Sequence, residues 1–108
     1  MIDVDAGRTI CGGDEERLQL LARTLSEEAD DLIAKIQDTA ESRDWNALHR
    51  YAHTLKGSAA VFDAAAVVEA ARRLEEQSEA GDTEVIDPLV SRLKIEVTRL
   101  QDALAPLF

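Results

Sequence analysis

Apolar side chains recur at intervals of three and four residues through most of the chain, the spacing that places them on one face of an α-helix. Four segments carry this pattern: residues 14–41, residues 44–62, residues 63–81, and a last segment that begins between Thr83 and Pro88 and ends before Pro106. The expected inward positions are, segment by segment, Leu18, Leu21, Leu25, Ala29, Leu32, Ile36 and Ala40; Trp45, Leu48, Ala52, Leu55 and Ala59; Ala64, Val67, Ala71, Leu74 and Ser78; and Ile86, Leu89, Leu93, Val97, Leu100 and Leu104. No Asn-Gly or Asp-Gly hairpin turn lies between alternating strands. The sequence therefore predicts an all-α protein.

Residues suited to helix ends bound these segments. Asp14 and Asp44 can accept hydrogen bonds from the free N–H groups of a first turn. Gly81 suits the end of the third helix. Pro88 is expected in the first turn of the fourth, where its missing N–H costs little. The links, residues 42–43, 62–63 and 81–82, are short, and short links between amphipathic helices imply antiparallel neighbours. We therefore predict an up-and-down antiparallel four-helix bundle over residues 14–105.

The N-terminal segment, residues 1–13, precedes this bundle and ends in a Gly12-Gly13 pair that breaks any earlier element. We expect a short extra helix here, covering one end of the bundle with Ile2, Val4 and Ile10. A length of 108 residues suits one domain, so residues 1–108 are predicted to form a single unit.

Charge narrows the classes of partner. The 22 acidic and 12 basic residues give a formal net charge of −10, which repels nucleic-acid backbones and anionic membrane surfaces. We therefore expect no nucleic-acid binding, no membrane insertion and a monomeric state. The start of the chain lacks the features of a secretory signal, and a lone Cys11 suits a reducing compartment, so the expected location is the cytoplasm.

The second helix carries the residues that point to chemistry. One step round from its core stripe lies a second row, formed by His49, His53, Lys56, Gly57 and Ala60. Lys56 and Gly57 follow His53 by three and four residues, so they are its neighbours on that face. An ammonium group there favours the neutral, nucleophilic ring by like-charge repulsion and would stabilise an arriving phosphoryl group.

Gly57 is unusual in the interior of a helix, where glycine costs roughly 0.5–1 kcal/mol relative to alanine. We interpret the compensation as space. Gly57, Ala60 and Ser58 would form a low floor beside the ring, on which a bulky partner can approach His53.

The stretch from Ala52 to Ala59, read as AHTLKGSA, resembles the signature of histidine-containing phosphotransfer (HPt) domains, the carriers of multistep two-component phosphorelays. The likeness covers roughly residues 14–104 and includes Asp44-Trp45 and the ARRLE stretch at 71–75. It implies that His53 takes a phosphoryl group, on Nε2, from a receiver-domain aspartate and passes it to another receiver. Lys56 would pair with the phosphoryl oxygens, and Gly57 would give the receiver room.

The resemblance also implies the surroundings of this site. His49, Ser58 and Ala60 are expected to belong to the docking surface. The first helix would flank it through Leu21, Ala22 or Leu25. One position departs from the family: Asp63 stands before Ala64, where the family usually has glycine. Aspartate tolerates left-handed backbone and caps helices, so we expect the turn to persist.

No P-loop or kinase motif occurs, so the chain is expected to be a phosphotransfer carrier without ATP binding or kinase activity. It would have no cofactor of its own, because Mg²⁺ would come with the partner. The implied partners are response-regulator receiver domains and a sensor (hybrid) histidine kinase.

Three alternatives stay open. The bundle could be an adaptor that binds a receiver without carrying phosphate. His49 and His53 have a spacing that suits zinc, although such a site needs more ligands and Lys56 opposes it. Arg72 and Arg73 are interpreted as a solvated face, the alternative being a rim contact to an acidic receiver.

Overall fold

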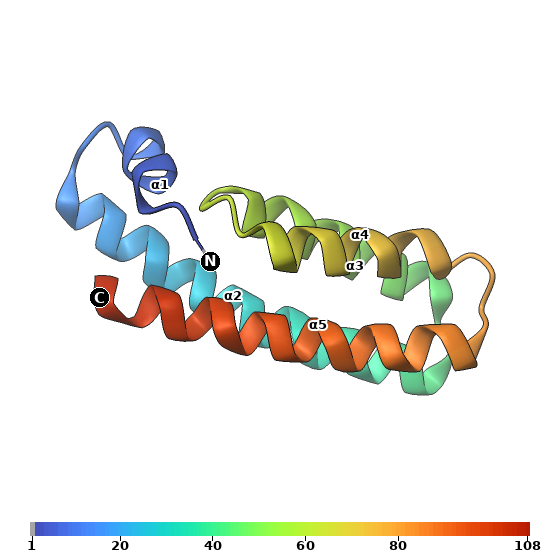
Figure 1. Cartoon of the computed structure of the whole chain (residues 1–108). Coiled ribbons are helices and arrows are strands. Elements are labelled where there is room, and N and C mark those ends of the chain that lie inside the picture. Colours follow the sequence, from blue (N-terminus) through green and yellow to red (C-terminus); the bar gives the residue numbers. More distant parts are fainter. Residues whose placement is uncertain (1) are drawn as a thin grey trace.

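Five α-helices and a final 3₁₀ turn make up the computed structural model, which describes residues 2–108 (Figure 1). The elements are α1 (Val4–Ile10), α2 (Glu15–Ser42), α3 (Trp45–Ala60), α4 (Ala65–Gln77), α5 (Thr83–Leu104) and η1 (Ala105–Leu107). No strand occurs among these residues. The predicted all-α bundle with an extra N-terminal helix is therefore confirmed.

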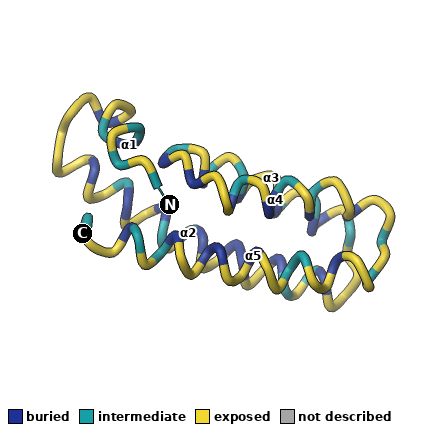
Figure 2. The backbone as a smooth tube through the Cα atoms, in the orientation of Figure 1, coloured by how far each residue is buried: buried dark blue, intermediate teal, exposed yellow. Residues whose placement is uncertain are grey.

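The four long helices close into an elongated bundle of 43 × 20 × 18 Å. α2 packs against α3 and α5, and α4 packs against the same two helices. Figure 1 shows the α3–α4 hairpin lying over the α2–α5 pair. This arrangement leaves the outer side of α3 uncovered along its length (Figure 2).

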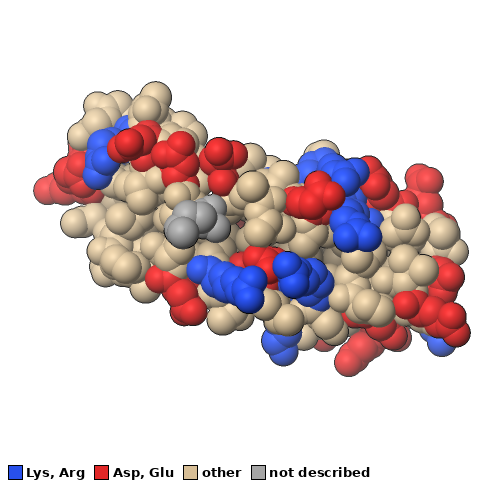
Figure 3. Space-filling view, in the orientation of Figure 1, with Lys and Arg blue, Asp and Glu red and all other residues tan. Residues whose placement is uncertain are grey.

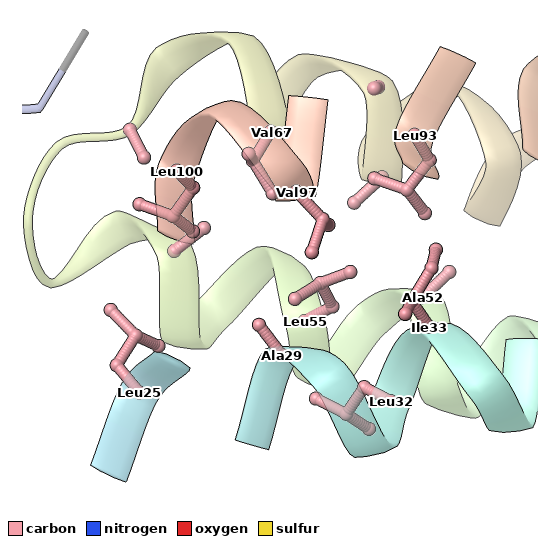
Figure 4. Packing of buried hydrophobic residues seen from close by; sticks show 14 of the residues in the cluster. Leu25, Ala29, Leu32, Ile33, Ala52, Leu55, Val67, Leu93, Val97 and Leu100 are labelled. Carbon is pink, nitrogen blue, oxygen red and sulfur yellow. The ribbon is translucent and has the colours of Figure 1, made fainter. Parts of the chain in front are cut away.

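The apolar face of each helix meets the others along the bundle axis (Figures 2 and 4). Of the predicted inward positions only Leu21, Trp45 and Leu89 are half-buried, and all the others are buried. Ala22, Ala29, Ala52, Ala59 and Ala71 are fully buried. Because alanine is small, these positions allow neighbouring helices to pack closely.

Side chains close the helix starts as expected at two places. Asp14 accepts hydrogen bonds from the N–H groups of Glu16 and Arg17, and Asp44 accepts one from Ala47. These bonds satisfy donors that an α-helix leaves free at its N-terminus. They therefore fix the start of α2 and of α3.

Two predicted helix ends were wrong. Pro88 is the sixth residue of α5, in its second turn rather than its first. The carbonyl that loses its intrahelical partner belongs to Glu84, and both residues are exposed, so water can replace the missing bond. Gly81 is not the end of α4, which stops at Gln77. Gly81 instead belongs to the turn before α5, where its φ is 63°. The indole of Trp45 packs closely against it, and a Cβ added to Gly81 would lie 2.7 Å from Nε1 of Trp45.

The N-terminal segment covers one end of the bundle, as predicted in part: Ile2 and Val4 pack against the core, whereas Ile10 is 63 % exposed. Gly7 makes a further contact, because its α-carbon lies so close to the Phe62 ring that a Cβ would come within 2.2 Å of it. The backbone N–H of Asp3 also donates to the carbonyl of Phe62 over 2.6 Å. These two contacts therefore hold the N-terminal segment against Phe62, in the turn between α3 and α4, and hydrophobic periodicity does not report them.

Candidate functional site

His53 stands on the uncovered side of α3 with 66 % of its side chain exposed. Its Nδ1 atom lies 2.8 Å from Oε1 of Glu75, which α4 places beside it. A carboxylate oxygen can only accept, so Nδ1 carries the proton and donates. In the neutral ring Nε2 then keeps its lone pair, and no residue from 2 to 108 forms a hydrogen bond with it. The site thus presents one free nucleophilic nitrogen.

Glu75 is the residue that sequence reasoning did not single out. Its side chain is only 14 % exposed, and Nζ of Lys56 lies 2.7 Å from its Oε2 atom. Hydrogen bonding from Lys56 is the main cause that lowers the pKa of Glu75, and the bond from His53 adds to it, against the opposing effect of burial. The carboxyl group is therefore ionised at neutral pH. Oε2 is buried, and the charge of the Lys56 ammonium group compensates for that burial.

This pairing changes the expected part of Lys56. As a neighbour on the same helix face, Lys56 is predicted to favour the neutral ring of His53 by like-charge repulsion. The ammonium group is instead bound to Glu75, and the same carboxylate binds both the lysine and the histidine. Lys56, Glu75 and His53 therefore form one cluster, which connects α3 to α4.

His49 lies one turn before His53 and against the end of α4. Its Nδ1 atom is 3.1 Å from the backbone carbonyl of Glu75, so this nitrogen also donates. Ser78 donates to the same carbonyl over 2.7 Å. Nε2 of His49 lies 3.8 Å from Oε1 of Glu75. His49 thus helps to fix the backbone that carries Glu75.

The floor expected beside the ring is present in part. A Cβ built on Gly57 would meet nothing within 4 Å, and Ala60 is exposed. Ser58 instead donates to Oε1 of Glu28 over 2.8 Å, which joins α3 to α2.

The three α2 residues expected to flank the site differ in their exposure. Leu21 is half-buried and retains some surface, whereas Ala22 and Leu25 are buried in the core. Of these three, Leu21 alone can contact a partner.

The other predicted arrangements can be placed as well. Among residues 2–108 no three His, Cys, Asp or Glu side chains are grouped to hold a metal ion. Arg72 forms ion pairs within α4, with Glu69 at 2.6 Å and with Glu76, which agrees with a solvated face. None of the described helices is long and apolar enough to cross a membrane.

Comparison with known proteins identifies the family. The family model for the Hpt domain matches residues 20–103. The chain belongs to the Hpt domain family. The fold of this Hpt domain is similar to that of histidine-containing phosphotransfer protein B (HptB) from Pseudomonas aeruginosa PAO1, with a TM-score of 0.88 and 17 % sequence identity. The match covers 97 % of this chain and 91 % of that one. No curated protein matches the sequence.

Membership of the Hpt domain family supports a role in histidine phosphotransfer within two-component phosphorelays. Asp63, which replaces the usual glycine of such domains, has a left-handed backbone with φ of 49°. The turn therefore persists, as expected. Asp63 does not cap α4, however, because the residue before this helix is Ala64 and no side chain bonds to its first turn.

Proposed function

We propose that this Hpt domain is a phosphorelay intermediate, which accepts a phosphoryl group on Nε2 of His53 from a receiver-domain aspartate and passes it to another receiver. The observation that carries the proposal is the hydrogen bond from Nδ1 of His53 to Glu75, which leaves Nε2 of an exposed ring with a free lone pair.

The transfer step forms one bond to phosphorus and breaks one. The Nε2 lone pair forms the N–P bond as the bond between phosphorus and the aspartyl oxygen breaks, and the aspartate leaves as a carboxylate. The proton on Nδ1 stays in place, so the phosphorylated ring is positively charged and the carboxylate of Glu75 offsets that charge. A charged ring is a good leaving group, which favours onward transfer to the next aspartate.

Lys56 and Gly57 have separate parts in this proposal. Lys56 holds the carboxylate of Glu75 beside His53 and places a positive charge near the phosphoryl oxygens. Gly57 leaves open the side on which a receiver approaches. Because the chain has no ATP-binding motif, the phosphoryl group comes from the partner, and the Mg²⁺ for the step lies in the receiver's acidic pocket.

The second candidate function is an adaptor that binds a receiver without accepting phosphate. An exposed, pre-oriented imidazole favours the carrier, because mere docking does not require a free nucleophilic nitrogen.

The test uses purified receiver domains from the source organism, phosphorylated with ³²P-labelled acetyl phosphate and Mg²⁺, then mixed with the full chain. We expect an acid-labile, base-stable label on the wild type, none on His53→Gln, and a retained label on the matched control His49→Gln. Equal labelling of wild type and His53→Gln would remove His53 as the acceptor. Receiver binding with no label on the wild type would establish the adaptor.

A further inference from the structure

A groove of about 540 Å³ runs along α3 beside the phospho-acceptor. Its lining residues are His49, Arg50, Tyr51, His53, Thr54 and Glu75. The groove begins one turn before His53, on the side away from the floor at Gly57. A partner that covers His53 therefore also covers this groove.

Two cations near this face are already paired. Lys56 binds Glu75, and Nζ of Lys35 on α2 lies 2.9 Å from Asp31. Arg50 differs, because no carboxylate oxygen from residues 2–108 lies within 4 Å of its guanidinium group, and that group forms no hydrogen bond with these residues. Its five N–H donors are available to a ligand from outside the chain.

The side chain of Arg50 is exposed and rests near an aromatic ring. Its guanidinium carbon lies 5.9 Å from the centroid of Tyr51. Such a contact at an exposed site is weak, so it orients the side chain without holding it there. Arg50 and His53 are three residues apart on one helix, and residues at that spacing are neighbours on the surface.

We propose that Arg50 is a phosphoryl-binding and docking residue, whose guanidinium group contacts the phosphoryl oxygens in transit while the receiver's acidic pocket covers the groove. The inference rests on the proposed function and names a residue of the same site. Arginine suits this part because its planar fork binds phosphate through two parallel hydrogen bonds. No proton moves at Arg50 during the step.

The overall charge of the protein makes a positive side chain at the contact important for docking. A net charge of −10 repels an acidic partner at long range, and Figure 3 shows acidic side chains spread from end to end of the face that it draws. Exposed charges are screened beyond about 8–10 Å at physiological salt, so an unpaired cation at the point of contact dominates the final approach. Among the residues that line the groove, Arg50 is the one lysine or arginine.

The test compares Arg50→Gln, Arg50→Lys and a matched control, Arg73→Gln, in transfer from a ³²P-phosphorylated receiver to the full chain. Arg73 is exposed on α4, has no carboxylate within 4 Å among the described residues, and does not line the groove. We expect Arg50→Gln to lower kcat/KM for transfer by about 10-fold or more and Arg50→Lys to recover part of it. Arg73→Gln should stay within about two-fold of wild type, since surface charges away from the contact have small effects. The ratio of the wild-type rate to the Arg50→Gln rate should fall as salt is added, because salt screens the attraction of Arg50 to the receiver's acidic pocket.

The outcomes separate this inference from the proposed function. A final label on Arg50→Gln that equals that of the wild type, reached more slowly, supports both. Transfer to Arg50→Gln at the wild-type rate, or an equal loss in Arg73→Gln, overturns the part of Arg50 and leaves His53 as acceptor. A changed melting temperature in Arg50→Gln would indicate a structural part and would likewise overturn the proposal.

Discussion

Replacing Gly57 by alanine should make this protein more stable. Gly57 lies in the interior of α3, and an added Cβ would meet nothing within 4 Å. The substitution therefore gains the helix propensity of alanine without a steric cost. We expect the free energy of unfolding to rise by about 0.5–1 kcal/mol. For a chain of this length the melting temperature should rise by about 2–6 °C.

Gly7 provides the matched control, because it is also a helical glycine but is closely packed. A Cβ at Gly7 would lie 2.2 Å from Cε1 of Phe62, whose ring is fully buried and cannot turn away. Overpacking of this kind costs about 1–3 kcal/mol, which exceeds the gain in propensity. Gly7→Ala should therefore lower the free energy of unfolding, and the same substitution has opposite signs at the two sites.

A side chain longer than alanine at Gly57 should slow phosphotransfer. Gly57→Gln places a flexible chain on the floor beside His53, so transfer from a phosphorylated receiver should slow by about 10-fold or more. Stability is measured by urea unfolding followed by circular dichroism, and transfer by single-turnover labelling. A Gly57→Ala variant that is less stable than wild type would contradict the open space inferred at Gly57. Wild-type transfer by Gly57→Gln would show that the open floor does not serve the receiver.

Two further predictions concern residues that the structure places in unusual environments. Because the pKa of Glu75 is lowered in the folded protein, this carboxylate contributes stability above its unfolded pKa of about 4.3 and loses it as pH falls through the folded value. Urea midpoints measured from pH 6 to pH 3 should therefore fall less steeply for Glu75→Gln than for wild type, and equal slopes would contradict the pairing. Asp63→Gly should stabilise the protein by up to about 1 kcal/mol, since glycine adopts the left-handed backbone at φ of 49° without strain. A loss of stability in the same urea assay would show that the Asp63 side chain makes a favourable interaction.

Local sequence rules were sufficient for the helices and for the residues that surround His53 on α3. A spacing of three and four residues placed the core faces, because a helix repeats every 3.6 residues whatever it packs against. The same rule put Lys56 and Gly57 beside His53 on one surface. Asp14 and Asp44 were recognised as caps because capping is a contact between residues two or three apart.

Contacts between helices could not be obtained in this way. Glu75 is 22 residues from His53, and only the packing of α4 on α3 brings its carboxylate to Nδ1. The available signals were its position next to Leu74, at the edge of the inner stripe, and its place in the ARRLE stretch at 71–75. The unpaired state of Arg50 likewise depends on which carboxylates the fold brings near it.

The sequence by itself determined that this chain is a bundle of amphipathic helices, and that a lysine and a glycine follow His53 by three and four residues on one helix face. Tertiary structure decided which nitrogen of that histidine is free, which cation is neutralised by a carboxylate, and how α1 closes one end through Gly7 and Phe62. The physical reason is the distance along the chain over which each effect acts. Periodicity and capping act within one or two turns of a helix. Hydrogen bonds and ion pairs between helices depend on how each helix is rotated about its axis and how closely the helices pack, and only the packed core sets these.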